Sequence, residues 1–165
     1  MPEIKSLYGI KKKIKCIGCS LQKGKINTLN ITETKNFNVS QDYETPIPGF
    51  LIISSKKHVR GIENFSKKER EEFIELLYNV RVALTRVLKI KNIDIINEEI
   101  SIERWSHFHV WLFPRYKWTE KFGESIDCVI PSMKFSQKSM RTEKNLKEVK
   151  NTAEKLRRYL LQKQQ

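Results

Sequence analysis

The sequence lacks any apolar run long enough to cross a membrane, because no stretch approaches the roughly 20 consecutive apolar residues that a spanning helix needs. Its first residues also lack the apolar segment of a secretory signal peptide. Cysteine is scarce, and three cysteines are an odd number, which argues against a framework of disulfides. We therefore expect a soluble, cytoplasmic protein that does not associate with membranes.

Length and composition favour one folded domain over residues 1–165. The chain has 165 residues and a mass of 19.6 kDa, which leaves little room for a second catalytic domain. Hydrophobic residues make up 39% of the sequence and aromatic residues 10%. This is enough apolar side chain to build a core, so wholesale disorder is excluded.

The surplus of positive charge lies at the two ends of the chain. The formal net charge is +13, with seven lysines against Glu3 in residues 1–30 and ten lysines or arginines against three glutamates in residues 131–165. Residues 31–130 are neutral, with 15 basic and 15 acidic side chains. Basic ends attract an anionic partner, whether nucleic acid, polyphosphate or an acidic protein. Charge alone leaves all three partners open.

Hydrophobic spacing predicts an α+β fold with an antiparallel sheet. The clearest element is a helix over about Lys67–Lys89, which begins with a capping box of Ser66 and Glu69. A turn at 46–49 precedes a short buried strand over 50–53. We also expect strands over 36–43, 93–96 and 107–114, a closing basic helix over 146–160, and loops with at most short helices in 1–30.

Two histidines in the last of these strands are the first candidates for chemistry. Alternation places His107, His109, Trp111 and Phe113 on one face of the strand, and Phe108, Val110 and Leu112 on the other. A His-x-His pair can be no more than the polar face of an edge strand. The apolar residues around the pair instead favour a central strand whose histidines line a pocket.

Cys16 and Cys19 have the spacing at which two thiolates bind one zinc ion, and histidines can supply the two further ligands of a structural site. Ordinary reduced thiols and a redox pair are the alternatives. A thioredoxin-like redox motif follows a strand and opens a helix, whereas this pair follows a lysine-rich segment, so we favour zinc. Cys128 stands alone and is predicted to be a buried thiol.

Together these residues resemble the histidine triad (HIT) superfamily of nucleotide hydrolases and transferases. Its signature of three alternating histidines, often followed by Pro-Arg, is similar to His-Phe-His-Val-Trp-Leu-Phe-Pro-Arg at 107–115. Residues 48–58, which end in Ser-Ser-Lys-Lys-His, resemble its upstream segment, with the long helix after it and the cysteine pair before it. The resemblance spans about residues 14–118 and leaves about 119–165 as a basic C-terminal extension.

The resemblance implies roles for five residues. The middle histidine of the signature is the nucleophile of the superfamily, and that position is His109. In zinc-bearing members, two cysteines bind the metal with the upstream histidine and the first signature histidine, here Cys16, Cys19, His58 and His107. A closed site of this composition is structural, so Zn²⁺ would fasten the N-terminal segment to the sheet and would not activate water.

Two positions depart from the superfamily pattern. Trp111 stands at the third histidine of the signature, and Phe50 stands where the superfamily has a histidine after the Pro-Gly turn. We expect the two rings to pack against each other and fast hydrolysis to be impaired. The uridylyltransferase branch of the superfamily carries glutamine at the third position and still forms a nucleotidyl-histidine, so covalent chemistry remains the expectation.

Substrate contacts are expected from Trp111 and from side chains near the signature strand. Asn97 lies where the superfamily often places an asparagine near the scissile phosphate, although asparagine is also common at strand ends. Arg104, Ser106 and Arg115 flank the strand and can bind phosphate oxygens. Solvated surface charge is the alternative for each arginine.

The resemblance implies an enzyme similar to the diadenosine polyphosphate hydrolases, which acts on the α-phosphate of dinucleoside polyphosphates or related nucleotides through a nucleotidyl-histidine. A nucleotidyltransferase of the uridylyltransferase type is one alternative. The other is a degenerate domain that only binds nucleotide, or binds nucleic acid through its basic ends. A homodimer is also implied, because many members pair through the long helix and extend the sheet across the two-fold axis. The apolar stripe of the long helix is widened here by Phe73, Leu77 and Val87, and the closing helix is the alternative cover for it.

Overall fold

The computed structural model describes residues 3–7, 11–99, 101 and 106–163. Its strands and helices are β1 (Glu3–Lys5), β2 (Lys11–Lys13), α1 (Ile17–Gln22), β3 (Asn30–Glu33), β4 (Phe37–Gln41), β5 (Leu51–Ser55), α2 (Lys67–Leu88), β6 (Ile93–Asn97), β7 (His109–Pro114), α3 (Val129–Ser139) and α4 (Glu143–Lys163). Short 3₁₀ helices lie at Ile62–Asn64, Lys117–Phe122 and Ile126–Cys128. The combination of helices with antiparallel strands confirms the predicted α+β class.

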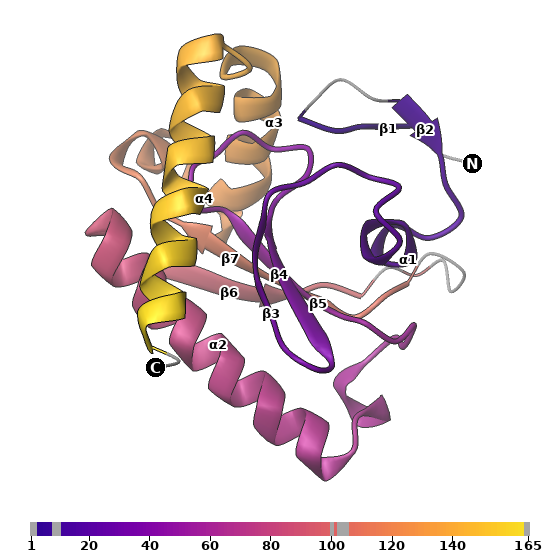
Figure 1. Cartoon of the computed structure of the whole chain (residues 1–165). Coiled ribbons are helices and arrows are strands. Elements are labelled where there is room, and N and C mark those ends of the chain that lie inside the picture. The colour runs from indigo at the N-terminus through magenta and orange to yellow at the C-terminus, as the bar shows by residue number, and fades with distance from the viewer. Residues whose placement is uncertain (1–2, 8–10, 100, 102–105, 164–165) are drawn as a thin grey trace.

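The five-stranded sheet is antiparallel throughout and has the order β3-β4-β5-β7-β6. The predicted histidine strand is therefore internal, since β7 lies between β5 and β6. In its register with β5, His109 lies opposite Ser54 and Trp111 lies opposite Ile52. Pro114 ends β7 as predicted, whereas His107 precedes the strand. Strands β1 and β2 form a separate two-stranded sheet beside α1 (Figure 1).

The long helix α2 forms where the sequence predicts it. Ser66 and Glu69 make the capping box, in which the Glu69 carboxylate accepts a 2.7 Å hydrogen bond from the Ser66 backbone N–H. The helix ends at Leu88 because Lys89 adopts the left-handed conformation, with φ 59°. Among the described residues, no helix has both the length and the apolar character needed to cross a membrane.

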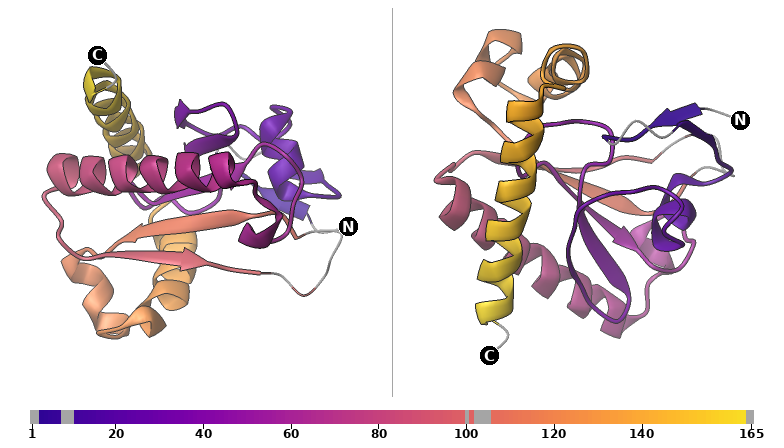
Figure 2. Two further views of the ribbon diagram at one scale, coloured as in Figure 1. Left: turned by 90° about the horizontal axis from the view of Figure 1, so that it is seen from below. Right: turned by 45° about the horizontal axis from the view of Figure 1, so that its top comes forward.

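Helices α2 and α4 pack against each other and form the main core with one face of the sheet (Figures 1 and 2). Leu84 of α2 and Leu156 of α4 are wholly buried there with Leu112 of β7. Full burial of a leucine side chain contributes about 1.5–3 kcal/mol. Helix α4 is therefore part of the packed structure, and it covers apolar surface of α2 for which the sequence suggested a second subunit.

The opposite face of the sheet carries the histidines. At one end of this face, Phe50 and Phe113 are wholly buried against Val129 of α3. Figure 2 shows α2 and the α3 segment on opposite sides of the strands. Helix α1 lies over the other end of this face, close to His107. The space between α1 and α3 is the candidate site.

Candidate functional site

Four potential metal ligands meet where α1 approaches the sheet. Cys16 caps the N-terminus of α1, and Cys19 lies in its first turn. His58 follows β5 and His107 precedes β7. The Nδ1 atom of His58 lies 3.4 Å from Cys16 Sγ and 3.2 Å from Cys19 Sγ, and Nδ1 of His107 lies 3.5 Å and 3.7 Å from the same sulfurs. The two Nδ1 atoms are 3.2 Å apart.

These separations fit a tetrahedral zinc site. With the usual zinc–sulfur and zinc–nitrogen bond lengths, neighbouring ligand atoms in a tetrahedron lie about 3.3–3.8 Å apart. All four ligand atoms of the cluster lie within 4.8 Å of one another. These are the same four residues for which the sequence implied a zinc site, and the structure brings them together with their ligand atoms facing one another.

The surroundings of His107 fix the orientation of its ring. Its Nε2–H donates a 2.8 Å hydrogen bond to the Ser55 carbonyl, which leaves the lone pair on Nδ1 facing the cysteines. Burial lowers the pKa of His107, against the opposing effect of the hydrogen bond to Ser55, and this favours the neutral ring. A Cβ atom on Gly18 would lie 2.3 Å from Cγ of His107, so only glycine lets α1 approach this closely. Burial, followed by the adjacent Cys16, raises the pKa of Cys19.

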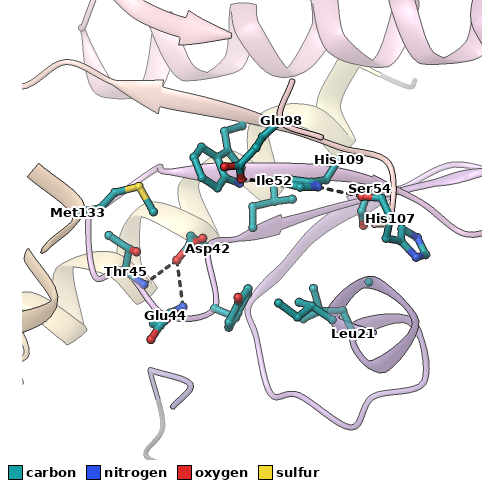
Figure 3. Close-up of a pocket in the computed structure, with 14 residues that line it drawn as sticks. Leu21, Asp42, Glu44, Thr45, Ile52, Ser54, Glu98, His107, His109 and Met133 are labelled. Carbon is teal, nitrogen blue, oxygen red and sulfur yellow. Dashed lines mark hydrogen bonds and ion pairs between the residues drawn. The ribbon is translucent and has the colours of Figure 1, made fainter. Parts of the chain in front are cut away.

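His109 lies beside this cluster and points into the pocket (Figure 3). Its Nδ1 lies 2.9 Å from the His107 carbonyl oxygen. Because a carbonyl can only accept, Nδ1 carries the proton, and the neutral ring keeps its lone pair on Nε2. A backbone contact therefore holds this histidine in one tautomer. The Nε2 atom lies 4.0 Å from a carboxylate oxygen of Glu98.

The pocket is closed at its two ends by different helices. Leu21 of α1 borders one end and Met133 of α3 borders the other (Figure 3). Trp111 lines the floor, and its ring packs edge-to-face on Phe50 with centroids 5.9 Å apart, as the sequence predicted. Phe50 has no exposed surface and contacts apolar neighbours, so a histidine at this position would be buried without a polar partner among them.

The other described residues that were expected to contact the substrate lie outside the pocket lining. Asn97 donates a 2.9 Å hydrogen bond to the His109 carbonyl, so it holds the strand that carries the nucleophile. Ser106 is buried next to His107 and does not line the pocket. Arg115 makes two hydrogen bonds to Asp94, of 2.7 and 2.9 Å, and a third to the Glu124 carbonyl. Because its guanidinium is occupied by these partners and lies outside the pocket lining, the structure does not support Arg115 as a phosphate ligand. Arg104 lies outside the described residues.

Sequence reasoning missed three acidic residues of the pocket: Asp42, Glu44 and Glu98. Asp42 and Glu44 lie between β4 and β5, and Glu98 follows β6. Their only signal was position, since Asp42 lies near the end of the predicted strand over 36–43 and Glu98 directly follows Asn97. Among the pocket-lining residues that the structure describes, there is no lysine or arginine.

Several solved structures share this fold. A hypothetical histidine triad nucleotide-binding protein from Sulfolobus tokodaii strain 7 aligns with a TM-score of 0.64 at 16% identity, over 89% of this chain and 93% of that one. The chain has the histidine triad fold. A zinc-bound histidine triad family protein from Mycobacterium smegmatis aligns with a TM-score of 0.60 at 17% identity, over 89% and 94% of the two chains.

A third structure, a HIT-like protein involved in cell-cycle regulation from Bartonella henselae, aligns with a TM-score of 0.59 at 14% identity, over 87% of this chain and 95% of that one. No family model matches the sequence, and no curated protein matches it. At these identities the comparisons establish the histidine triad fold, and the chemistry must be argued from the residues of the pocket.

Asp42 gives the stability of this fold a predictable pH dependence. Burial raises the pKa of its carboxyl to about 6, although Oδ1 accepts hydrogen bonds from the backbone N–H groups of Glu44 and Thr45, at 3.0 and 2.6 Å. The folded chain therefore holds this proton more tightly than the unfolded chain, whose aspartates titrate near pH 4. The contribution of Asp42 to the free energy of unfolding is largest below about pH 4 and is lost as the pH rises through about 6.

Asp42→Asn should reverse this loss. The amide oxygen of asparagine can accept both backbone hydrogen bonds without burying a charge. Urea unfolding at pH 8 should show the variant to be more stable than the wild type by about 1–2 kcal/mol, and the advantage should vanish near pH 4. An equal stability difference at both pH values would contradict this interpretation of Asp42.

Proposed function

We propose that this protein is a nucleotide-binding hydrolase that attacks the α-phosphate of dinucleoside polyphosphates or related nucleotides and forms a nucleotidyl-histidine at His109. One observation carries the proposal: the His107 carbonyl holds Nδ1–H of His109, so the Nε2 lone pair is directed into the pocket. A neutral imidazole fixed in this way is ready to act as a nucleophile. The fold it shares with named histidine triad proteins supports the same chemistry.

The reaction has two steps. The Nε2 lone pair forms a bond to the α-phosphorus while the bond from phosphorus to the leaving oxygen breaks and that oxygen keeps the electron pair. The ring then carries a positive charge, which the hydrogen bond from Nδ1–H to the His107 carbonyl stabilises. Water attacks the phosphorus next and gives up a proton to a nearby base or to solvent, the nitrogen–phosphorus bond breaks, and Nε2 regains its lone pair.

We also propose that Cys16, Cys19, His58 and His107 bind one structural Zn²⁺. The donor set is two sulfurs and two nitrogens with separations that suit a tetrahedron, and one similar structure is zinc-bound by its name. A closed site leaves no position for substrate. The metal would supply a cross-link between α1, the segment after β5 and the segment before β7, which places His107 and hence the carbonyl that orients His109.

Mass spectrometry of the intact protein tests the proposed activity. The protein is mixed with dinucleoside polyphosphates, nucleoside triphosphates and 4-nitrophenyl nucleotides. The reaction is stopped without acid, and the mass of the intact protein is measured. We expect a mass increase of one nucleoside monophosphate less water, which peptide mapping should assign to His109. A transferase gives the same adduct but transfers it to an acceptor faster than to water. No adduct and no turnover with any of these nucleotides would leave the binding module as the function.

We propose a homodimer with an interface different from the one that the apolar stripe of α2 suggested. Phe73 is buried in the chain's own core, and Leu77 and Val87 are partly buried against it. Ile74 and Tyr78, one turn apart on α2, are exposed by 59% and 63%, and Ile95 on the edge strand β6 is exposed by 48%. Light scattering at micromolar concentration should give the mass of a dimer, and Tyr78→Lys should shift it toward the monomer. A monomeric wild-type mass would contradict the dimer.

A further inference from the structure

His109, the proposed nucleophile, has an acidic neighbour in the pocket, Glu98. The Glu98 carboxylate lies 4.0 Å from Nε2 of His109, the atom that would bond to phosphorus. Glu98 directly follows β6, and Figure 3 shows it at the same wall of the pocket as His109. The side chain of Glu98 is 47% exposed, whereas that of His109 is 17% exposed. A phosphate bonded to Nε2 would therefore lie next to this carboxyl group.

The other groups in the pocket are less suited to proton transfer at that phosphate. Oδ1 of Asp42 accepts two backbone hydrogen bonds, and the charge of Glu44 faces Arg141. Burial, followed by the charges of Asp42, Glu44 and Glu98, raises the pKa of Tyr43 far above neutrality. Trp111 stands at the third signature position, and an indole N–H donates a hydrogen bond but does not release its proton.

A bound phosphate determines which form of Glu98 is favoured. A phosphate anion held against a carboxylate repels it, and no lysine or arginine among the described pocket-lining residues offsets this repulsion. A bound phosphate therefore favours the protonated carboxyl over the carboxylate, and the protonated form can donate a hydrogen bond. Leaving oxygens with a high proton affinity need such a donor as their bond to phosphorus breaks.

We propose that Glu98 is the general acid and base of the reaction, in the role that the absent third histidine would otherwise fill. In the first step the carboxyl gives its proton to the leaving oxygen as that oxygen departs from phosphorus. In the second step the carboxylate takes a proton from the attacking water, which restores the acid. This inference rests on the proposed nucleotidyl-histidine. It predicts that the fall in rate on replacing Glu98 depends on the leaving group.

The test compares two nucleoside 5′-monophosphate esters with the full-length protein. The 4-nitrophenyl ester releases a stable phenolate and needs little protonation, whereas the phenyl ester needs a proton. Glu98→Gln should slow formation of the adduct from the phenyl ester by about 10²-fold or more, and should change the rate with the 4-nitrophenyl ester by less than about threefold. The adduct should also persist longer in this variant, because water attack loses its base.

Matched variants make the result specific. Glu99→Gln changes the next residue, an exposed glutamate paired with Arg60 at 3.7 Å, and should leave both rates unchanged. The wild-type rate with the phenyl ester should fall at high pH as the acid loses its proton. Glu98→Gln should remove this fall, and Asp42→Asn should retain it. Glu98→Asp should recover part of the rate with the phenyl ester.

The outcomes separate this inference from the proposed function. Equal slowing of both esters in Glu98→Gln, or no slowing of either, while the wild type forms the adduct at His109, overturns the role of Glu98 alone. Absence of the adduct in the wild type with both esters overturns the proposed nucleotidyl-histidine and the role of Glu98 with it.

Discussion

Replacing His109 with asparagine or glycine should abolish the nucleotidyl adduct and the turnover of every nucleotide that the wild type cleaves. The reason is that no other described side chain presents an unprotonated nitrogen to the pocket: His107 uses Nε2 for Ser55 and turns Nδ1 toward the cysteines. Nucleotide binding should weaken by no more than about 1–2 kcal/mol, because the walls of the pocket are unchanged. Calorimetric titration and a turnover assay on the same preparation measure the two effects.

The glycine variant supplies its own control. Removing the imidazole of His109 leaves space that free imidazole can occupy, with its lone pair available to attack phosphorus. Added imidazole should therefore restore cleavage in His109→Gly and release a nucleoside phosphorimidazolide, and it should do so less well in His109→Asn, where the side chain fills part of the space. Turnover that survives in both variants without imidazole would show that His109 is not the nucleophile.

Elements with strong local signals could be predicted from the sequence. Helix α2 begins within its predicted capping box and ends within one residue of the predicted end, since both the cap and the apolar spacing are local. The predicted strand over 107–114 matches β7 except at its first two residues. Strands β1 and β2, in a region expected to hold loops and at most short helices, were missed, and so were strand β3 and helix α3. Helix α3 contains Pro131, which a helix accepts only in its first turn. Its buried face includes Ser132 and Ser136, so the apolar spacing that predicts a helix is interrupted there.

The candidate site was predicted in its residues more than in its geometry. The cysteine and histidine cluster and the packing of Trp111 on Phe50 followed from the sequence. The tautomers of His107 and His109 did not, because they depend on two backbone carbonyls, those of Ser55 and His107, whose directions only the folded chain defines. The position of Glu98 depends on the pairing of β6 with β7, which composition and spacing do not encode.

Purified protein should carry about one zinc ion per chain, and the Cys16→Ser, Cys19→Ser double variant should carry none. Hydroxyl groups do not replace thiolates as zinc ligands, and two histidines alone form an incomplete site. Loss of the ion should lower the free energy of unfolding by about 3 kcal/mol, the effect of a ligand present at a few hundred times its Kd. This corresponds to a fall in Tm of roughly 6–12 °C for a chain of this size.

The effect should be confined to the region that the metal fastens. The core between the sheet, α2 and α4 contains none of the four ligands, so amide hydrogens of α2 should keep their protection from exchange while those of α1 lose it.

Cys128→Ser is the matched control, because it removes a buried thiol that packs against Phe113 and Val129, outside the cluster. That variant should retain one zinc ion and the protection of α1. Metal retained by the double variant, or none found by elemental analysis of wild type prepared without chelators, would contradict the zinc site. In the second case the close approach of α1 to His107 at Gly18 would have to be stabilised by the packing of α1 alone.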